Sequence, residues 1–268
     1  MKLKPGSCVR WLSRLTGLVV ALVAFAAVAA DVHVMISAGF YDAYAELVPA
    51  FEQSSGNHLV TTRGPSLGDS PEAIPTRLRR GEPADVVIML AASIDDLMRQ
   101  GLLRQGSKRD LARSEIGMVV RAGAAKPDIS TVDALRRTLI EAKSIAYSDS
   151  GSGIYLSTTL FAQLGVADQV AGKSRKVKGP PSGEPVAAVV ARGDAEIGFQ
   201  QVSELVHVPG VTFVGTIPAQ LQQEIFYAAA LANGVSQPEA AAALIRLLAS
   251  PEAASAISKA GLTPLSRP

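Results

Sequence analysis

The sequence predicts an α/β fold, in which strand and helix segments alternate along most of the chain. The run ADVVIML at 84–90 is continuously apolar, which is typical of a strand buried on both faces of a sheet. A strand-like segment at 31–39 is followed by apolar residues at helical spacing over 41–56, and the same rhythm restarts at residue 115. This alternation favours largely parallel sheets covered by helices.

The other segments continue the pattern in chain order. Strands are expected at 58–62, 115–123, 144–149 and 224–234, and the segment 197–205 is expected to form a strand, a turn and a helix start. Helices are expected at 72–81, 93–103 with Ser93 as N-cap, 128–143, 150–165 after a Gly/Ser turn, 184–196, 237–250 and 251–261.

Residues 1–29 have the composition of a signal peptide. Four basic residues precede an apolar run that is too short to span a bilayer comfortably, and Ala27-Val28-Ala29 has the spacing of a cleavage site. We therefore expect an exported, periplasmic protein whose mature chain begins at Ala30 or Asp31. The remaining length is enough for one large domain or two smaller lobes.

Removal of this leader changes the charge balance. Its four basic residues reduce 26 Lys and Arg to 22 against 24 Asp and Glu, so the net charge of +2 becomes −2. Cys8 is also removed, which leaves no disulfide and no thiolate ligand. His33, His58 and His207 are scattered without the spacing of a metal site. We expect no metal, no cofactor and no nucleic-acid partner, and a monomer.

Several strand-to-helix junctions carry small polar residues that suit an anion. In open α/β sheets ligands bind beyond the carboxyl ends of strands, where a helix start offers free N–H groups and the positive end of its dipole. Three junctions fit, at 37–41, 62–66 and 147–153, and a weaker one lies at 200–204. The candidate binding residues are Ser37, Gly39, Arg63, Ser66, Ser150, Gly151, Ser152 and Gln201.

Each junction taken alone also fits an ordinary turn or helix cap. Their occurrence in both halves of the chain favours a site between the halves. Arg63 is the most specific of these residues, because a guanidinium can hold a carboxylate with two parallel hydrogen bonds. The other interpretation is a solvated arginine at the end of a strand.

Five segments together resemble the periplasmic molybdate-binding protein family, whose members have the type II solute-binding fold. They are GEPADVVIML, ARSEIGMVVRAG, SIAYSDSGSGIYLSTTLFAQLG, GDAEIGFQQVSEL and SPEAASAISKAGLTPL. The resemblance implies two α/β lobes joined by crossing strands, with a ligand cleft between them that closes on binding. It implies a first lobe of residues 30–113 plus 217–268 and a second lobe of residues 114–216.

The sequence departs from the family pattern within the expected cleft. The serine that the family has at its first helix start aligns with Gly39, and its tyrosine in the return segment aligns with Gln201. The loop after the second strand is longer and adds Arg63. An inorganic oxyanion held by neutral hydroxyls and N–H groups needs no arginine, so these departures favour an organic polycarboxylate over molybdate.

One branch of this family contains periplasmic aconitate isomerases, which this chain resembles in size, export signal and altered cleft. That resemblance implies interconversion of cis- and trans-aconitate by an allylic proton shift, without a cofactor. By loop position the candidate bases are Tyr155, Glu204 and Asp149. The alternative is the solute receptor of an ABC importer for an organic acid or oxyanion, with a permease as partner, and the sequence leaves both open.

Overall fold

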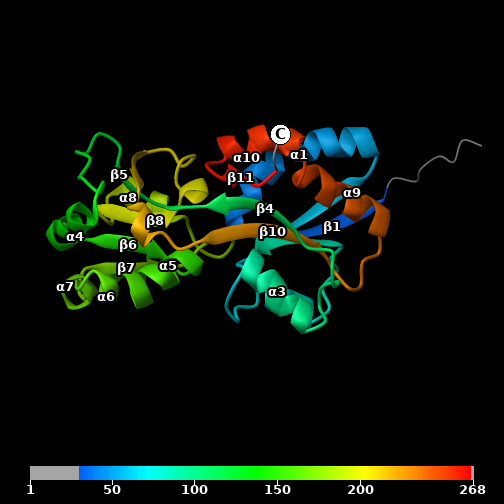
Figure 1. Cartoon of the computed structure of the whole chain (residues 1–268), viewed down its shortest axis with the longest axis horizontal. Coiled ribbons are helices and arrows are strands. Elements are labelled where there is room, and N and C mark those ends of the chain that lie inside the picture. Colours follow the sequence, from blue (N-terminus) through cyan, green and yellow to red (C-terminus); the bar gives the residue numbers. More distant parts are fainter. Residues whose placement is uncertain (1–29, 267–268) are drawn as a thin grey trace, which may run out of the picture.

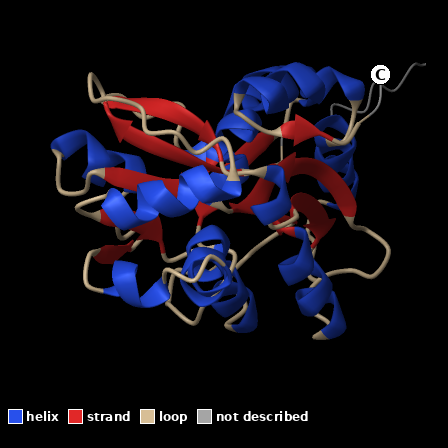
Figure 2. Cartoon of the chain, turned by 60° about the vertical axis from the view of Figure 1, so that its left-hand side comes forward, coloured by secondary structure: helices blue, strands red, loops and turns tan. Residues whose placement is uncertain are grey.

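The computed structural model describes residues 30–266, so the predicted signal peptide lies outside the described residues. The chain forms a six-stranded sheet with the order β11-β4-β10-β3-β1-β2 and a five-stranded sheet with the order β7-β6-β8-β5-β9. Figure 1 shows the two sheets side by side along the long axis of the molecule. Helices pack around both sheets (Figure 2). The α/β fold predicted from the sequence is confirmed.

Each sheet mixes parallel and antiparallel neighbours. β1 pairs in parallel with β2 and β3, and β6 pairs in parallel with β7 and β8, whereas β10 and β5 run antiparallel to both of their neighbours. The strands are β1 (Asp31–Ile36), β2 (His58–Arg63), β3 (Val86–Leu90), β4 (Arg109–Ser114), β5 (Ile116–Arg121), β6 (Ile145–Ser148), β7 (Ser174–Val177), β8 (Ile197–Gln201), β9 (Val211–Thr216), β10 (Ile225–Leu231) and β11 (Thr263–Pro264). The expectation of largely parallel sheets is therefore wrong for the strands nearest the connections between the sheets.

The helices follow the predicted order with shifted ends. They are α1 (Ala38–Ser55), α2 (Ile74–Arg79), α3 (Ala91–Arg99), α4 (Val132–Glu141), α5 (Gly151–Tyr155), the π-helical turn η1 (Leu156–Leu160), α6 (Phe161–Gln163), α7 (Ala167–Ala171), α8 (Val186–Arg192), α9 (Pro238–Leu248), α10 (Ala254–Lys259) and the short 3-10 turns η2 (Val202–Glu204), η3 (Ala219–Leu221) and η4 (Pro251–Ala253). Within residues 30–266 no single helix is long and apolar enough to cross a membrane. Helix α9 and the segment Pro251–Lys259 pass that test together by length and composition alone, with a bend of 59° between them.

The chain crosses between the sheets twice. It leaves the first sheet between β4 and β5, where only Glu115 separates the strands, and it returns between β9 and β10. The sequence did not predict β4, because three of the six residues in RDLARS are charged and exposed, and the segment has no strand-like apolar alternation. We propose that the lobes divide at these crossings, with residues 30–113 and 217–268 in one lobe and residues 114–216 in the other.

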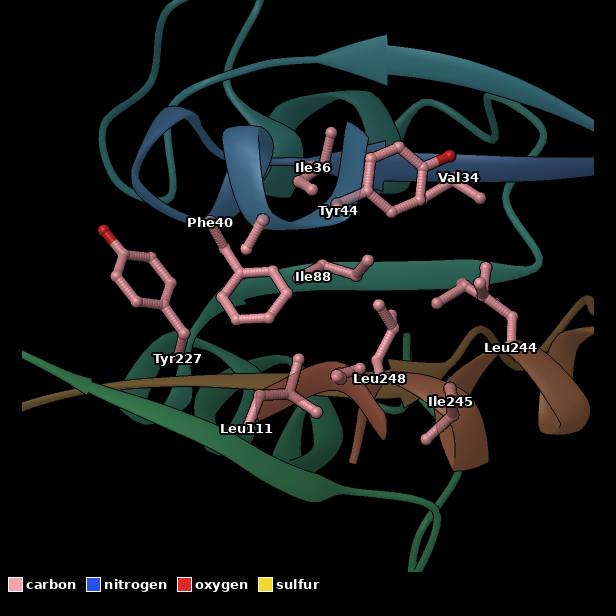
Figure 3. Close-up of a cluster of buried hydrophobic side chains, with 14 of the residues drawn as sticks. Val34, Ile36, Phe40, Tyr44, Ile88, Leu111, Tyr227, Leu244, Ile245 and Leu248 are labelled. Carbon is pink, nitrogen blue, oxygen red and sulfur yellow. The ribbon is translucent and has the colours of Figure 1, made fainter. Parts of the chain in front are cut away.

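A buried apolar cluster fixes the start of α1 against the first sheet. Val34, Ile36 and Ile88 of the sheet pack with Phe40 of α1, and the apolar face of α9 closes the cluster (Figure 3). Burial of each such side chain stabilises the fold by ~1.5–3 kcal/mol. This packing holds the carboxyl ends of β1 and β3 and the first turn of α1 next to one another.

Asp85, just before β3, connects three parts of the first lobe. Its carboxylate accepts hydrogen bonds from the backbone N–H of His33 at 2.8 Å, from the N–H and hydroxyl of Ser236 at 2.6 and 2.9 Å, and from the N–H of Gln237 at 3.1 Å. Burial by itself would raise the pKa of Asp85, but these hydrogen bonds outweigh it and hold the pKa below its usual value. Asp85 thus joins β1 to the start of α9.

We predict that Asp85→Asn lowers the free energy of unfolding by about 2 kcal/mol. Both carboxylate oxygens of Asp85 accept hydrogen bonds, whereas asparagine has a single accepting oxygen and an NH₂ group that cannot accept. Since the folded-state pKa lies below the unfolded value near ~3.9, this stabilisation is present above that pH and is lost as the pH falls through the folded pKa. Urea unfolding at pH 7 measures the effect. Asp69→Asn, at an exposed position, is the control and should change stability by less than ~0.5 kcal/mol. Equal stability of Asp85→Asn and the unchanged protein would contradict the assignment.

Candidate functional site

A cavity of about 50 Å³ lies between the two lobes; we call it the central cavity. Its volume is several times the ~10–15 Å³ that one water molecule requires, so it can admit more than one small polar group of a ligand. The lining comes from the carboxyl ends of β1, β2, β3, β6 and β8 and the segments that follow them, from the loop after β7, and from one residue of β10. It consists of Ser37, Ala38, Gly39, Gly64, Pro65, Ser66, Leu67, Leu90, Ser148, Asp149, Ser150, Gly151, Gly179, Pro180, Gln200, Gln201, Glu204 and Tyr227.

The first turn of α1 faces this cavity with an unpaired hydroxyl. Ser37 is the N-cap residue, with extended backbone angles, yet its side chain makes no capping hydrogen bond. Its Oγ is buried and has no hydrogen-bond partner among the described residues. A buried hydroxyl without a partner costs free energy unless a ligand or water satisfies it. Together with the free N–H groups of an 18-residue helix, it suits an anionic ligand.

Gly39 makes room for a pair of side chains at the base of the cleft. The Tyr227 hydroxyl donates a hydrogen bond to Oε1 of Gln201, which joins a strand of the first lobe to the end of β8 in the second. A Cβ atom at position 39 would overlap the Tyr227 hydroxyl. Burial raises the pKa of Tyr227 well above its usual value, so the phenol stays protonated and acts as a donor. In Figure 3 the Tyr227 hydroxyl points away from the apolar cluster.

The second lobe contributes a set of hydroxyls at the start of α5. The Oγ of Ser148 lies 2.8 Å from that of Ser150 and 3.2 Å from that of Ser152. Gly151 is in the cavity wall, where a Cβ atom would come within 3.2 Å of a Leu90 methyl group from the first lobe. The two lobes are therefore in close contact at this helix start.

Glu204 is the acidic group with the most altered ionisation in the cleft. Its pKa is raised to about 7, chiefly by burial and to a smaller extent by the charges of Asp149 and Asp42. A hydrogen bond of 2.8 Å from Nε2 of Gln200 and the charge of Arg63 act in the opposite direction. A carboxyl group with a pKa near neutrality can both accept and donate a proton at physiological pH.

Arg63 lies beside Glu204 in a second cavity of about 300 Å³, which we call the side cavity. The side cavity shares Ala38, Pro180, Gln200 and Glu204 with the central cavity. The Arg63 guanidinium carbon lies 4.0 Å from the centre of the Tyr41 ring, at cation–π distance. Arg63 therefore borders the cleft, although it is not in the wall of the central cavity.

The structure brings most of the predicted site residues together. Those in the central cavity wall are Ser37, Gly39, Ser66, Asp149, Ser150, Gly151, Gln201 and Glu204. Ser152 is fully buried behind the wall. The Tyr155 hydroxyl donates to the carbonyl of Leu221 at 2.8 Å. Tyr155 lines an adjoining groove that shares Leu67, Leu90 and Gly151 with the central cavity, so it lies outside the central cavity wall. Within residues 30–266 no three His, Cys, Asp or Glu side chains gather as metal ligands.

Tyr227 is a cavity residue that the sequence did not predict, and Gln200 lies in the predicted junction 200–204 without being among the candidate binding residues. Tyr227 lies in the strand segment IFYAAAL, where it is the one side chain with a hydroxyl group. A single polar group in an otherwise apolar strand could have marked it as a candidate site residue. Gln200 adjoins the predicted Gln201. Its Oε1 accepts from the N–H of Val186 at 3.2 Å while its Nε2 contacts Glu204, so it links α8 to the carboxyl group.

Residues 32–263 match the family model for bacterial extracellular solute-binding proteins. The chain belongs to this family. The position of the cleft at the carboxyl ends of strands from two lobes agrees with a solute-binding protein, as does the anion-compatible lining.

Two characterised proteins are similar to this chain over most of its length. The chain is 47% identical over 232 residues to an aconitate isomerase from a Pseudomonas species, covering 87% of each chain. It is 28% identical over 228 residues to the molybdate-binding protein ModA of Azotobacter vinelandii, covering 82% of this chain and 85% of that one. The resemblance stated from the sequence is confirmed, including its aconitate isomerase branch.

Solved structures of solute-binding proteins share the two-lobed fold. The periplasmic molybdate-binding protein of Azotobacter vinelandii superposes with a TM-score of 0.69 at 21% identity, covering 87% of this chain and 98% of that one. The sulfate-binding protein SubI of Mycobacterium tuberculosis superposes with a TM-score of 0.70 at 18% identity, covering 88% and 87%. At these identities the likeness shows the fold.

We predict that Gly39→Ala destabilises the protein by about 1–3 kcal/mol, because the added methyl group must displace the Tyr227–Gln201 pair. Thermal unfolding measures this change. Gly172→Ala is the matched control, since a Cβ there meets nothing within 4 Å and the backbone φ is −71°. Unchanged stability of Gly39→Ala would show that the pair is not held in the arrangement described.

Proposed function

We propose that this protein is a cofactor-independent aconitate isomerase that acts in the periplasm after removal of residues 1–29. The observation that carries the proposal is Glu204, a carboxyl group with a pKa raised to about 7, at the edge of a cavity lined by helix starts from both lobes. The 47% identical aconitate isomerase supports the choice of substrate. The solute-binding family supports the export of the chain.

Binding of the substrate would use the donors of the two lobes. The N-terminus of α1, with the unpaired Ser37 hydroxyl, would hold one carboxylate, and the Ser150–Gly151 segment would hold another. The Tyr227 phenol already donates to Gln201, so it would keep the Gln201 amide oriented towards the ligand. These donors are fixed before the ligand arrives, which is the arrangement that stabilises developing charge most effectively.

The proposed reaction is an allylic proton shift within aconitate. Ionised Glu204 removes a proton from the methylene carbon, the double bond moves by one position, and negative charge spreads onto the adjoining carboxylate. The donors at the helix starts stabilise this charge. Protonated Glu204 returns the proton to the carbon that was vinylic, so no atom is gained or lost and the carboxylate is restored. The former single bond between the methylene carbon and the central carbon becomes the new double bond, so the conformation about that bond when the proton leaves decides whether the cis or the trans form results.

The other two candidate bases are less suited to this role. Oδ1 of Asp149 accepts a hydrogen bond from the N–H of Gly179 at 3.1 Å, and we assign Asp149 to shaping the cavity and raising the pKa of Glu204. The Tyr155 hydroxyl is occupied by its hydrogen bond to the Leu221 carbonyl, and Tyr155 is not in the central cavity wall, so we give it no part in the mechanism.

The test is to incubate the mature protein with cis- or trans-aconitate and to follow the other isomer by chromatography. We predict turnover from both directions, and a fall in kcat of ~10²–10⁴-fold in Glu204→Gln, which is the usual contribution of a general base. Glu141→Gln, at an exposed site at the end of α4, is the matched control and should retain full activity.

Two outcomes would overturn the proposal. Tight binding of aconitate without any turnover would select the receptor of an ABC importer for an organic acid. Binding of neither isomer would exclude both polycarboxylate functions. Full activity of Glu204→Gln would leave the isomerase but remove Glu204 as its base.

A further inference from the structure

The side cavity has the features of a binding subsite that the mechanism above does not use. It is lined by residues of α1, β2, the 179–185 loop and the segment after β8, so both lobes contribute to it. Its walls are Ala38, Asp42, Arg63, Pro180, Pro185, Gln200, Ser203, Glu204, His207 and Val208. At about 300 Å³ it can hold more than a water molecule, and it meets the central cavity at Glu204.

Two polar groups in this cavity wall lack partners. Ser203 is only 4% exposed, and its Oγ makes no hydrogen bond to any described residue. The Nε of Arg63 is likewise buried without a partner, and no carboxylate among residues 30–266 lies within ion-pair distance of Arg63. Native proteins satisfy nearly all buried polar groups, so two such donors beside one cavity indicate an acceptor that binds there.

The position of the Arg63 guanidinium is fixed by its neighbours. It stacks over the Tyr41 ring at 4.0 Å, which orients the flat group and leaves its edge free for hydrogen bonds. The acidic side chains that line the cavity are Glu204 and Asp42, and Asp42 is exposed, where water weakens its repulsion of an anion. His207, also exposed, is the remaining titratable group in the wall.

We infer that the side cavity is a carboxylate subsite, in which Arg63 and Ser203 bind one terminal carboxylate of a tricarboxylic acid and thereby select it over dicarboxylic acids. The inference rests on the proposed function for the identity of the ligand. Two carboxylates of the ligand lie in the central cavity and the third lies in the side cavity. The carbon chain that links them must therefore pass Glu204, where the two cavities meet. Arg63 and Ser203 are thus specificity-determining residues that also place the reacting methylene carbon.

The experiment compares two saturated acids that cannot isomerise. Tricarballylate has the three carboxylates of aconitate, and methylsuccinate lacks one terminal carboxylate. Isothermal titration calorimetry of the mature protein is expected to show tricarballylate binding at least tenfold more tightly. Ser203→Ala and Arg63→Gln should each weaken tricarballylate binding about tenfold or more and leave methylsuccinate binding unchanged.

Ser174→Ala is the matched control, because the Ser174 hydroxyl is also buried without a partner but lies on β7, away from both cavities. It should bind both acids as the unaltered protein does. The inference is overturned if the unaltered protein binds the two acids equally or binds neither. It is also overturned if Ser203→Ala and Arg63→Gln weaken both acids alike or neither. Since neither acid reacts, these results are independent of whether aconitate is turned over.

Discussion

The partial burial of one carboxyl group, Glu204, is the constraint on which the function of this cleft depends. An exposed glutamate is fully ionised at neutral pH and is too weak a base to remove a carbon-bound proton efficiently. Withdrawal from water where the lobes meet raises the pKa to about 7, and the acidic neighbours Asp149 and Asp42 act in the same direction. The group can then exchange a proton with a ligand near physiological pH.

The fold creates this environment by bringing together the carboxyl ends of parallel strands from two separate sheets. Strand ends supply helix starts, and helix starts supply N–H groups that attract an anion without adding mobile positive charge. The unpaired hydroxyls of Ser37 and Ser203 extend the donor set along the cleft. A protein that only binds an anion needs no more than these hydrogen-bond donors. A proton-transferring carboxyl group at the same place is the feature that distinguishes the proposed enzyme from a receptor of the same fold.

The sequence predicted the fold class and most of the cavity wall, because strand-to-helix junctions with small polar residues are local signals. It did not predict β4, because the three charged residues of that strand leave no apolar alternation that would indicate it. It also did not predict the antiparallel direction of β5 and β10, which depends on pairing between distant segments. Tyr227 was missed for the same reason, since its approach to Gly39 and Gln201 is a tertiary contact. Tyr155 and Glu204 had similar local signals, and the structure separates them by direction and burial.

The most direct measurement of the central claim is the ionisation of Glu204 itself. Carboxyl carbons can be followed by nuclear magnetic resonance in a protein labelled with carbon-13 at glutamate, and comparison with Glu204→Gln identifies the signal. The account predicts a titration midpoint near pH 7 in the ligand-free mature protein. A midpoint near ~4.3, the value of an ordinary exposed glutamate, would contradict it.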